Sequence, residues 1–149
     1  MLRFSTEQIV WQEVPGEVSL AYTITGCQLG CKGCHSIESW DANQGTLLTD
    51  DYFEQRLNQY HGLISCVLFL GGEWQPAPLQ HMLQLARQRN LNTCLYTGLD
   101  AIDANLKDEL TYLKTGRWLP ERGGLDNPNT NQQLMDLRTG QILNHRFIR

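Results

Sequence analysis

The chain has 149 residues, of which 41% are hydrophobic and 19% are charged, and its 12 Lys and Arg against 16 Asp and Glu give a net charge of −4. This composition is typical of a single globular domain over residues 1–149 and disfavours both intrinsic disorder and a nucleic-acid-binding surface, which needs clustered excess Lys and Arg. The length excludes a complete (β/α)8 barrel, which takes about 250 residues.

The N-terminal residues MLRFSTEQIV lack a basic segment followed by an apolar run, so no secretory signal is expected. The longest apolar stretch, residues 63–70, is far shorter than the roughly 20 residues that span a bilayer. The five cysteines are an odd number, and three of them crowd together at residues 27–34, which argues against a disulfide framework. We therefore expect a cytoplasmic protein without a membrane partner.

Predicted strands and helices alternate along the chain. Val18–Thr25 is rich in β-branched and aromatic residues and forms a strand that runs into the cysteines. Thr49 can cap a following helix, and residues 63–70 form a strand whose continuous apolar run suits burial on both faces. Further elements are a helix beginning near Pro76 or Pro78, a strand at Leu91–Thr97, a short helix at Asp100–Glu109 and a strand at Leu110–Lys114, with irregular structure beyond Thr115.

This order of elements predicts an α/β fold with a mainly parallel sheet and right-handed crossovers. Ligands of such sheets collect at the carboxyl ends of the strands. The cysteines follow the first predicted strand, Gly71–Glu73 follows the second, and Thr97 and Gly98 follow the third. We therefore expect these three loops at one edge of the sheet.

Cys27, Cys31 and Cys34 have the spacing C-x3-C-x2-C, with glycines between them. Converging thiolates select zinc or an iron–sulfur cluster. A structural zinc site normally has four protein ligands, whereas a [4Fe–4S] cluster held by three cysteines leaves one iron for a small molecule. The set of three thiols favours the cluster.

A zinc-binding interaction module is the alternative from another class of protein. Its fourth ligand would be His35, Cys66, Cys94 or a residue of a partner chain. Cys66 and Cys94 are the poorer candidates because both lie in apolar strand segments, where a free cysteine behaves as a small hydrophobic residue.

The cysteine loop with GGE after the next strand resembles the radical S-adenosylmethionine (SAM) superfamily. The segment GCQLGCKGCHSIESW at residues 26–40 more closely resembles the activating proteins of anaerobic ribonucleotide reductase. Further similar segments are FLGGEW at 69–74, YTG at 96–98, YLKTGRW at 112–118 and GGLDNPNTNQ at 123–132. The resemblance implies a radical SAM fold, a partial (β/α) barrel with a mainly parallel sheet and helices on the outside.

The resemblance also implies two cofactors and their binding residues. Cys27, Cys31 and Cys34 would bind three irons of a [4Fe–4S] cluster, and SAM would bind the fourth iron. Gly71 and Gly72 would let the backbone approach the methionine end of SAM, and either Glu73 or the neighbouring backbone would accept from its ammonium group. Thr97 and Gly98 are candidates for further SAM contacts, or for an ordinary turn.

The implied activity is an oxidoreductase reaction in which an electron from the cluster cleaves SAM, and the resulting 5′-deoxyadenosyl radical takes a hydrogen atom from a glycine. The implied partners are the large catalytic subunit of anaerobic ribonucleotide reductase and a reductase that supplies electrons. An activase of another glycyl-radical enzyme, such as a formate-lyase type, is the nearest alternative. Outside the motifs, Trp74 is expected to pack in the core. Lys114 is expected to be solvated, and the alternative is that it lies in the cavity and meets a carboxylate.

Overall fold

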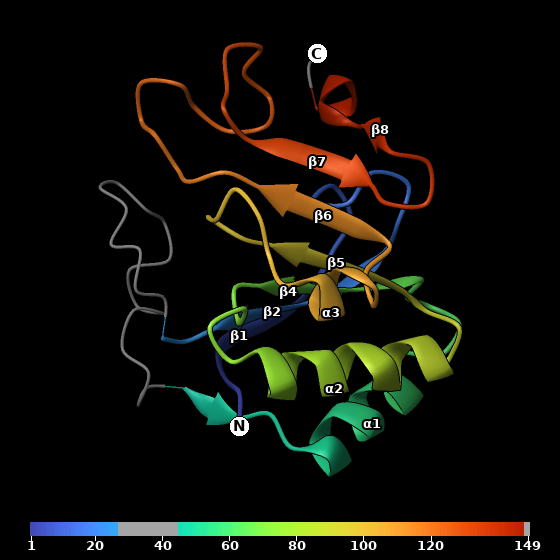
Figure 1. Cartoon of the computed structure of the whole chain (residues 1–149). Coiled ribbons are helices and arrows are strands. Elements are labelled where there is room, and N and C mark those ends of the chain that lie inside the picture. The colour runs from blue at the N-terminus through green and yellow to red at the C-terminus, as the bar shows by residue number, and fades with distance from the viewer. Residues whose placement is uncertain (27–44, 148–149) are drawn as a thin grey trace.

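A computed structural model describes residues 1–26 and 45–147 of the chain (Figure 1). The described strands are β1 (Arg3–Val10), β2 (Ser19–Ile24), β3 (Thr46–Leu47), β4 (Cys66–Leu70), β5 (Asn92–Tyr96), β6 (Tyr112–Thr115), β7 (Gln133–Asp136) and β8 (Gln141–Ile142). The described helices are α1 (Asp50–Gln59), α2 (Pro76–Gln88), α3 (Ala104–Lys107) and a 3-10 helix at Asn144–Arg146.

The eight described strands form one sheet in the order β3-β1-β2-β4-β5-β6-β7-β8. The central strands β2, β4, β5 and β6 are mutually parallel, with Thr23 opposite Leu70 and Leu70 opposite Tyr96. Antiparallel strands extend this centre on both sides, β1 and β3 at one edge and β7 and β8 at the other. The sheet is therefore mixed.

The predicted partial (β/α) barrel with helices on the outside is wrong. The described residues form a mixed sheet of eight strands with three short α-helices. The physical reason is clearest after β6, where residues 116–132 contain Gly116, Pro120, Gly123, Gly124 and Pro128. Such residues disfavour a crossover helix, so the chain returns through an irregular segment to an antiparallel strand.

The predicted helices are confirmed in their positions. Thr49 caps α1 as expected, because its side chain accepts a hydrogen bond from Tyr52 N at 3.2 Å, and two acidic residues occupy the first turn. Pro76 begins α2, whose buried residues Leu79, Met82, Leu83 and Ala86 recur at helical spacing. The predicted helix at Asp100–Glu109 shortens to the single turn of α3, with Asp103 as its cap.

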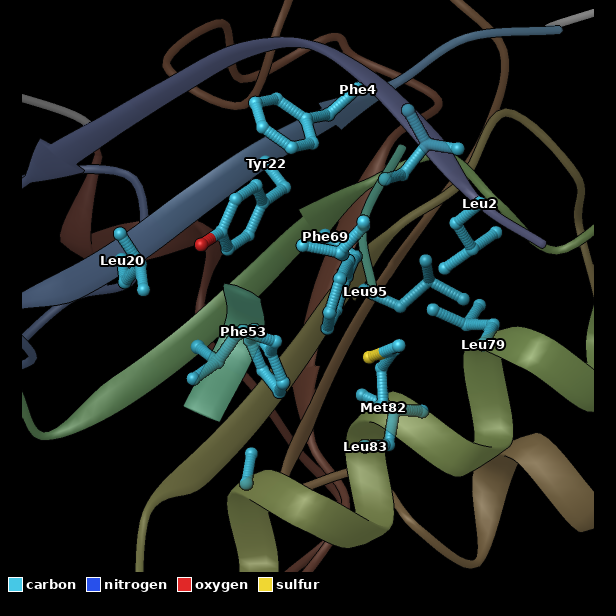
Figure 2. Close-up of a cluster of buried hydrophobic side chains, with 14 of the residues drawn as sticks. Leu2, Phe4, Leu20, Tyr22, Phe53, Phe69, Leu79, Met82, Leu83 and Leu95 are labelled. Carbon is cyan, nitrogen blue, oxygen red and sulfur yellow. The ribbon is translucent and has the colours of Figure 1, made fainter. Parts of the chain in front are cut away.

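All three α-helices pack on the same face of the sheet. The buried residues Phe53 of α1, Met82 of α2 and Leu106 of α3 belong to one apolar cluster with residues of the central strands. Figure 2 shows Tyr22, Phe69 and Leu95 of the sheet facing Phe53 and the α2 side chains. Trp74 is partly buried against this cluster, as its predicted packing role requires.

Among the described residues, loops and the C-terminal segment with its 3-10 helix cover the opposite face of the sheet, where no α-helix packs. Its apolar cluster joins Ala21, Leu68 and Cys94 of the central strands to Val14 of the β1–β2 loop and Leu143 near the C-terminus. No helix within residues 1–26 and 45–147 is long and apolar enough to cross a membrane.

Candidate functional site

The ends of the parallel strands place two of the three predicted loops at one edge of the sheet. Gly71 N donates to Tyr96 O at 2.9 Å, and Gly116 N donates to Leu99 O at 3.0 Å, so the residues that follow β4, β5 and β6 lie at the same edge. Gly26 follows β2, which pairs in parallel with β4, and the cysteine segment begins after it. Cys27, Cys31, Cys34 and the alternative ligand His35 themselves lie outside the described residues.

Gly71 and Gly72 form a tight turn that other residues would not enter without strain. Their φ angles are +87° and +107°, a region that favours glycine. A Cβ atom on Gly71 would lie 2.6 Å from the Trp74 ring, and one on Gly72 would lie 3.4 Å from Ile24. The backbone conformation and local packing therefore explain why glycines occupy both positions. Their contact with SAM stays a prediction.

Glu73 is fixed at this edge by a neighbouring strand end. Thr97 Oγ1 donates to Glu73 Oε1 at 2.6 Å and itself accepts from Leu99 N at 3.1 Å. The second oxygen, Glu73 Oε2, is buried and has no hydrogen-bond partner among residues 1–26 and 45–147. Buried polar atoms normally have a partner, so this oxygen is an acceptor that is open to a donor from a ligand.

Lys114 lies at the same edge and is buried, with 8% of its surface exposed, so the prediction of a solvated side chain is wrong. Its Nζ donates to Gly116 O at 2.9 Å and to Thr97 O at 3.3 Å, and it lies 5.8 Å from the centre of the Tyr96 ring. The signal in the sequence is the alternation of β6, which puts Lys114 on the same face as Tyr112.

The edge therefore carries opposite charges on two sides of Thr97. A carboxylate oxygen can accept from a cationic group, and the Lys114 ammonium can meet an anionic one. Because Thr97 bonds to Glu73 through its hydroxyl and to Lys114 through its carbonyl, these groups are held in place before a ligand arrives.

Cys66 and Cys94 are buried free thiols in β4 and β5, as predicted from their apolar surroundings. Burial raises the pKa of Cys66 to about 12 and raises the pKa of Cys94 well above its ordinary value. A metal ligand must be a thiolate, and burial opposes its formation here. Within the described parts of the chain, no group of three or more His, Cys, Asp and Glu side chains could hold a metal ion.

Comparison with known proteins defines the class as an iron–sulfur protein. The family model of a 4Fe-4S single cluster domain matches residues 14–116, which is more than half of the chain. The chain therefore belongs to this family of iron–sulfur domains, which is associated with radical SAM proteins. The match spans the three clustered cysteines and the strand ends as far as Gly116. None of the curated proteins matches the chain.

Proposed function

We propose that the protein is a radical SAM activase that cleaves SAM reductively and generates a glycyl radical on the large subunit of anaerobic ribonucleotide reductase. One observation carries the proposal: a buried carboxylate oxygen of Glu73 without a described partner lies at the sheet edge where the cysteine segment begins. The family match adds the [4Fe–4S] cluster, and the motif resemblance adds the target.

The acceptor and the donor at this edge suit the amino-acid end of SAM. Glu73 Oε2 is the acceptor for the ammonium group, and the Lys114 ammonium is the partner for the carboxylate. Cys27, Cys31 and Cys34 would hold the cluster. The chemistry that the bound cofactors supply is the one-electron reductive cleavage of the SAM sulfonium, with the electron delivered by a reductase.

The residues of this chain orient the ligand and limit its movement. Leu99 N donates to Thr97 Oγ1, so the Thr97 proton points toward Glu73 Oε1 and leaves Oε2 for the ligand. Holding both charged ends of SAM keeps its sulfonium in one position, which is the contribution that a protein makes to cofactor chemistry. The same edge of the sheet would receive the glycine-bearing segment of the large subunit.

Anaerobic reconstitution with iron and sulfide tests the proposal. We expect about four irons per chain and SAM cleavage under reducing conditions, both lost when Cys27, Cys31 or Cys34 is replaced by Ala. The matched control is Cys66→Ala, which removes a thiol from the buried strand β4 and is expected to retain iron and cleavage. Bound zinc without SAM cleavage would overturn the proposal and favour the zinc-binding module.

The identity of the target needs a separate experiment. The reconstituted protein is mixed with SAM, a reductant and either the large subunit of anaerobic ribonucleotide reductase or a formate-lyase enzyme. Electron paramagnetic resonance is expected to detect a glycyl radical on the reductase subunit. A radical formed on the formate-lyase enzyme alone would reassign the protein to that class of activase.

A further inference from the structure

The end of the irregular segment 117–132 crosses closely over the end of β6. Gly116 has a φ angle of +104°, and a Cβ atom there would lie 3.0 Å from both Asn131 O and Gln132 Cα. Asn131 Nδ2 also donates to Arg117 O at 3.1 Å. The segment that contains the TNQ residues 130–132 is thus packed against the backbone that follows Lys114.

Gln132 is the buried side chain at this crossing, with 7% of its surface exposed. Its Nε2 donates to Gly116 O at 3.5 Å. Its backbone is held on both sides, because its N donates to Thr130 Oγ1 at 3.0 Å and its carbonyl accepts from Asn144 Nδ2 at 2.7 Å. The Gln132 amide therefore reaches Gly116 from a fixed backbone.

The Gly116 carbonyl accepts two hydrogen bonds, one from Gln132 Nε2 and one from Lys114 Nζ. Lys114 Nζ is in turn bonded to the carbonyl of Thr97, whose hydroxyl donates to Glu73. A continuous polar chain therefore runs from Gln132 across the ends of β6, β5 and β4. It begins at a residue outside the family match, which ends at residue 116.

We propose that Gln132 is a positioning residue that holds the Gly116 carbonyl and through it fixes the Lys114 ammonium at the ligand edge. A lysine side chain is a flexible four-carbon stem, so its ammonium group keeps one position only where its N–H donors meet fixed acceptors. This inference rests on the proposed function in one respect, namely that the Lys114 ammonium meets the carboxylate of SAM. Gln132 itself touches neither SAM nor the cluster in this role.

The variant that tests this role is Gln132→Met, which retains the length of the side chain and removes the amide. The matched control is Gln133→Met, since Gln133 is exposed and its side chain lies on the opposite face of β7 from that of Leu134. Gln132→Ala serves as a second variant if the thioether packs poorly. Thermal unfolding of each variant separates loss of the fold from loss of positioning.

The first readout needs no SAM. In the full chain before reconstitution, a buried and hydrogen-bonded ammonium group exchanges its protons slowly, so 15N-labelled protein is expected to show a Lys114 side-chain resonance that Lys114→Met removes. We expect proton exchange at Lys114 to be at least about threefold faster in Gln132→Met and unchanged in Gln133→Met. Equal exchange rates in both variants would overturn the inference, independently of the affinity for SAM.

The second readout measures SAM in the reconstituted protein. Gln132→Met is expected to raise the Kd and the KM for SAM about fivefold, with kcat within about twofold of wild type. In a Lys114→Met background the Gln132 substitution is expected to add nothing, because the group it positions is gone. Additive effects would show that Gln132 acts elsewhere and would overturn the inference.

The two readouts also separate this inference from the proposed function. If wild-type protein binds no SAM while Lys114 exchange still depends on Gln132, the proposed function fails and the positioning of Lys114 stands. If wild-type protein binds and cleaves SAM while Gln132→Met matches Gln133→Met in both readouts, the positioning role alone fails.

Discussion

A glutamate lies at each end of the parallel strands, and the two differ in how many of their carboxylate oxygens accept hydrogen bonds. At the amino ends, Glu17 accepts from Ser65 Oγ at 2.7 Å, from Asn92 Nδ2 at 2.9 Å and from the Tyr112 hydroxyl at 2.8 Å. At the carboxyl ends, Glu73 accepts from Thr97 alone among the described residues. Both oxygens of Glu17 have partners, whereas one oxygen of Glu73 does not.

The difference indicates that the two ends of the sheet serve different purposes. The three donors to Glu17 come from the starts of β4, β5 and β6, so this carboxylate ties the parallel strands together and contributes to stability. A buried acceptor left open, as at Glu73, costs stability until a ligand supplies the donor. Substitutions at the two glutamates should therefore change different properties of the protein.

The largest expected effect is on stability, at Glu17. Glu17→Leu leaves the donors of Ser65, Asn92 and Tyr112 without their acceptor, and at about 1 kcal/mol for each bond the free energy of unfolding should fall by about 3 kcal/mol. Urea unfolding measures this loss. Glu121→Leu, at an exposed position, is the control. The Kd for SAM of the folded Glu17 variant should equal that of wild type; a matching loss of SAM affinity would contradict the division between the two ends.

The next effect is on ligand affinity, at Glu73. Glu73→Gln keeps the shape of the side chain and removes its charge, so the Kd for SAM should rise at least about tenfold, the size expected for a hydrogen bond to a charged group. The free energy of unfolding should not fall, because Oε2 has no partner to lose among the described residues. Equilibrium binding and urea unfolding measure the two quantities. Glu17→Gln, the same chemical change at the other end, should leave the Kd unchanged.

The centre of the sheet could be predicted from the sequence because its strands carry strong local signals. Val18–Thr25 contains β2, whose residues are all buried, and residues 63–70 contain β4. The outer strands lack such signals. β1 has no continuous buried run like that of β2, because Thr6 and Gln8 are exposed between less exposed neighbours. β3 and β8 have only two residues each. Those strands depend on tertiary pairing with their neighbours, which no local pattern reports.

Part of the candidate site could also be predicted from the sequence. The parallel-strand rule brings Glu73 and Thr97 to one edge, and their side chains indeed meet. The alternation of β6 indicates the face on which Lys114 lies, but its hydrogen-bond partner could not be predicted, because Gly116 and Gln132 come together only when the irregular segment folds back. Cys27, Cys31 and Cys34 lie outside the described residues, so their role as ligands stays a prediction.

The smallest expected effect is at Arg138, which contacts the Tyr112 hydroxyl that donates to Glu17. Arg138 Nη2 donates to Asp136 Oδ2 at 2.9 Å and to the Tyr112 hydroxyl at 3.1 Å, and the guanidinium lowers the pKa of Asp136 below its ordinary value. A carboxyl with a lowered pKa in the folded state stabilises the protein above its unfolded pKa of about 4, and this contribution is lost as the pH falls through the folded value.

Arg138→Leu should therefore reduce the free energy of unfolding at pH 7 by less than about 1 kcal/mol, because the Arg138 side chain is 55% exposed and solvent screens the pair. The difference between variant and wild type should shrink as the pH falls below the unfolded pKa of about 4 and through the lowered pKa of folded Asp136. Urea unfolding across this pH range measures it. A difference that stays the same on acidification would mean that Arg138 acts through the neutral Tyr112 hydroxyl, which does not change charge in this pH range, and not through Asp136.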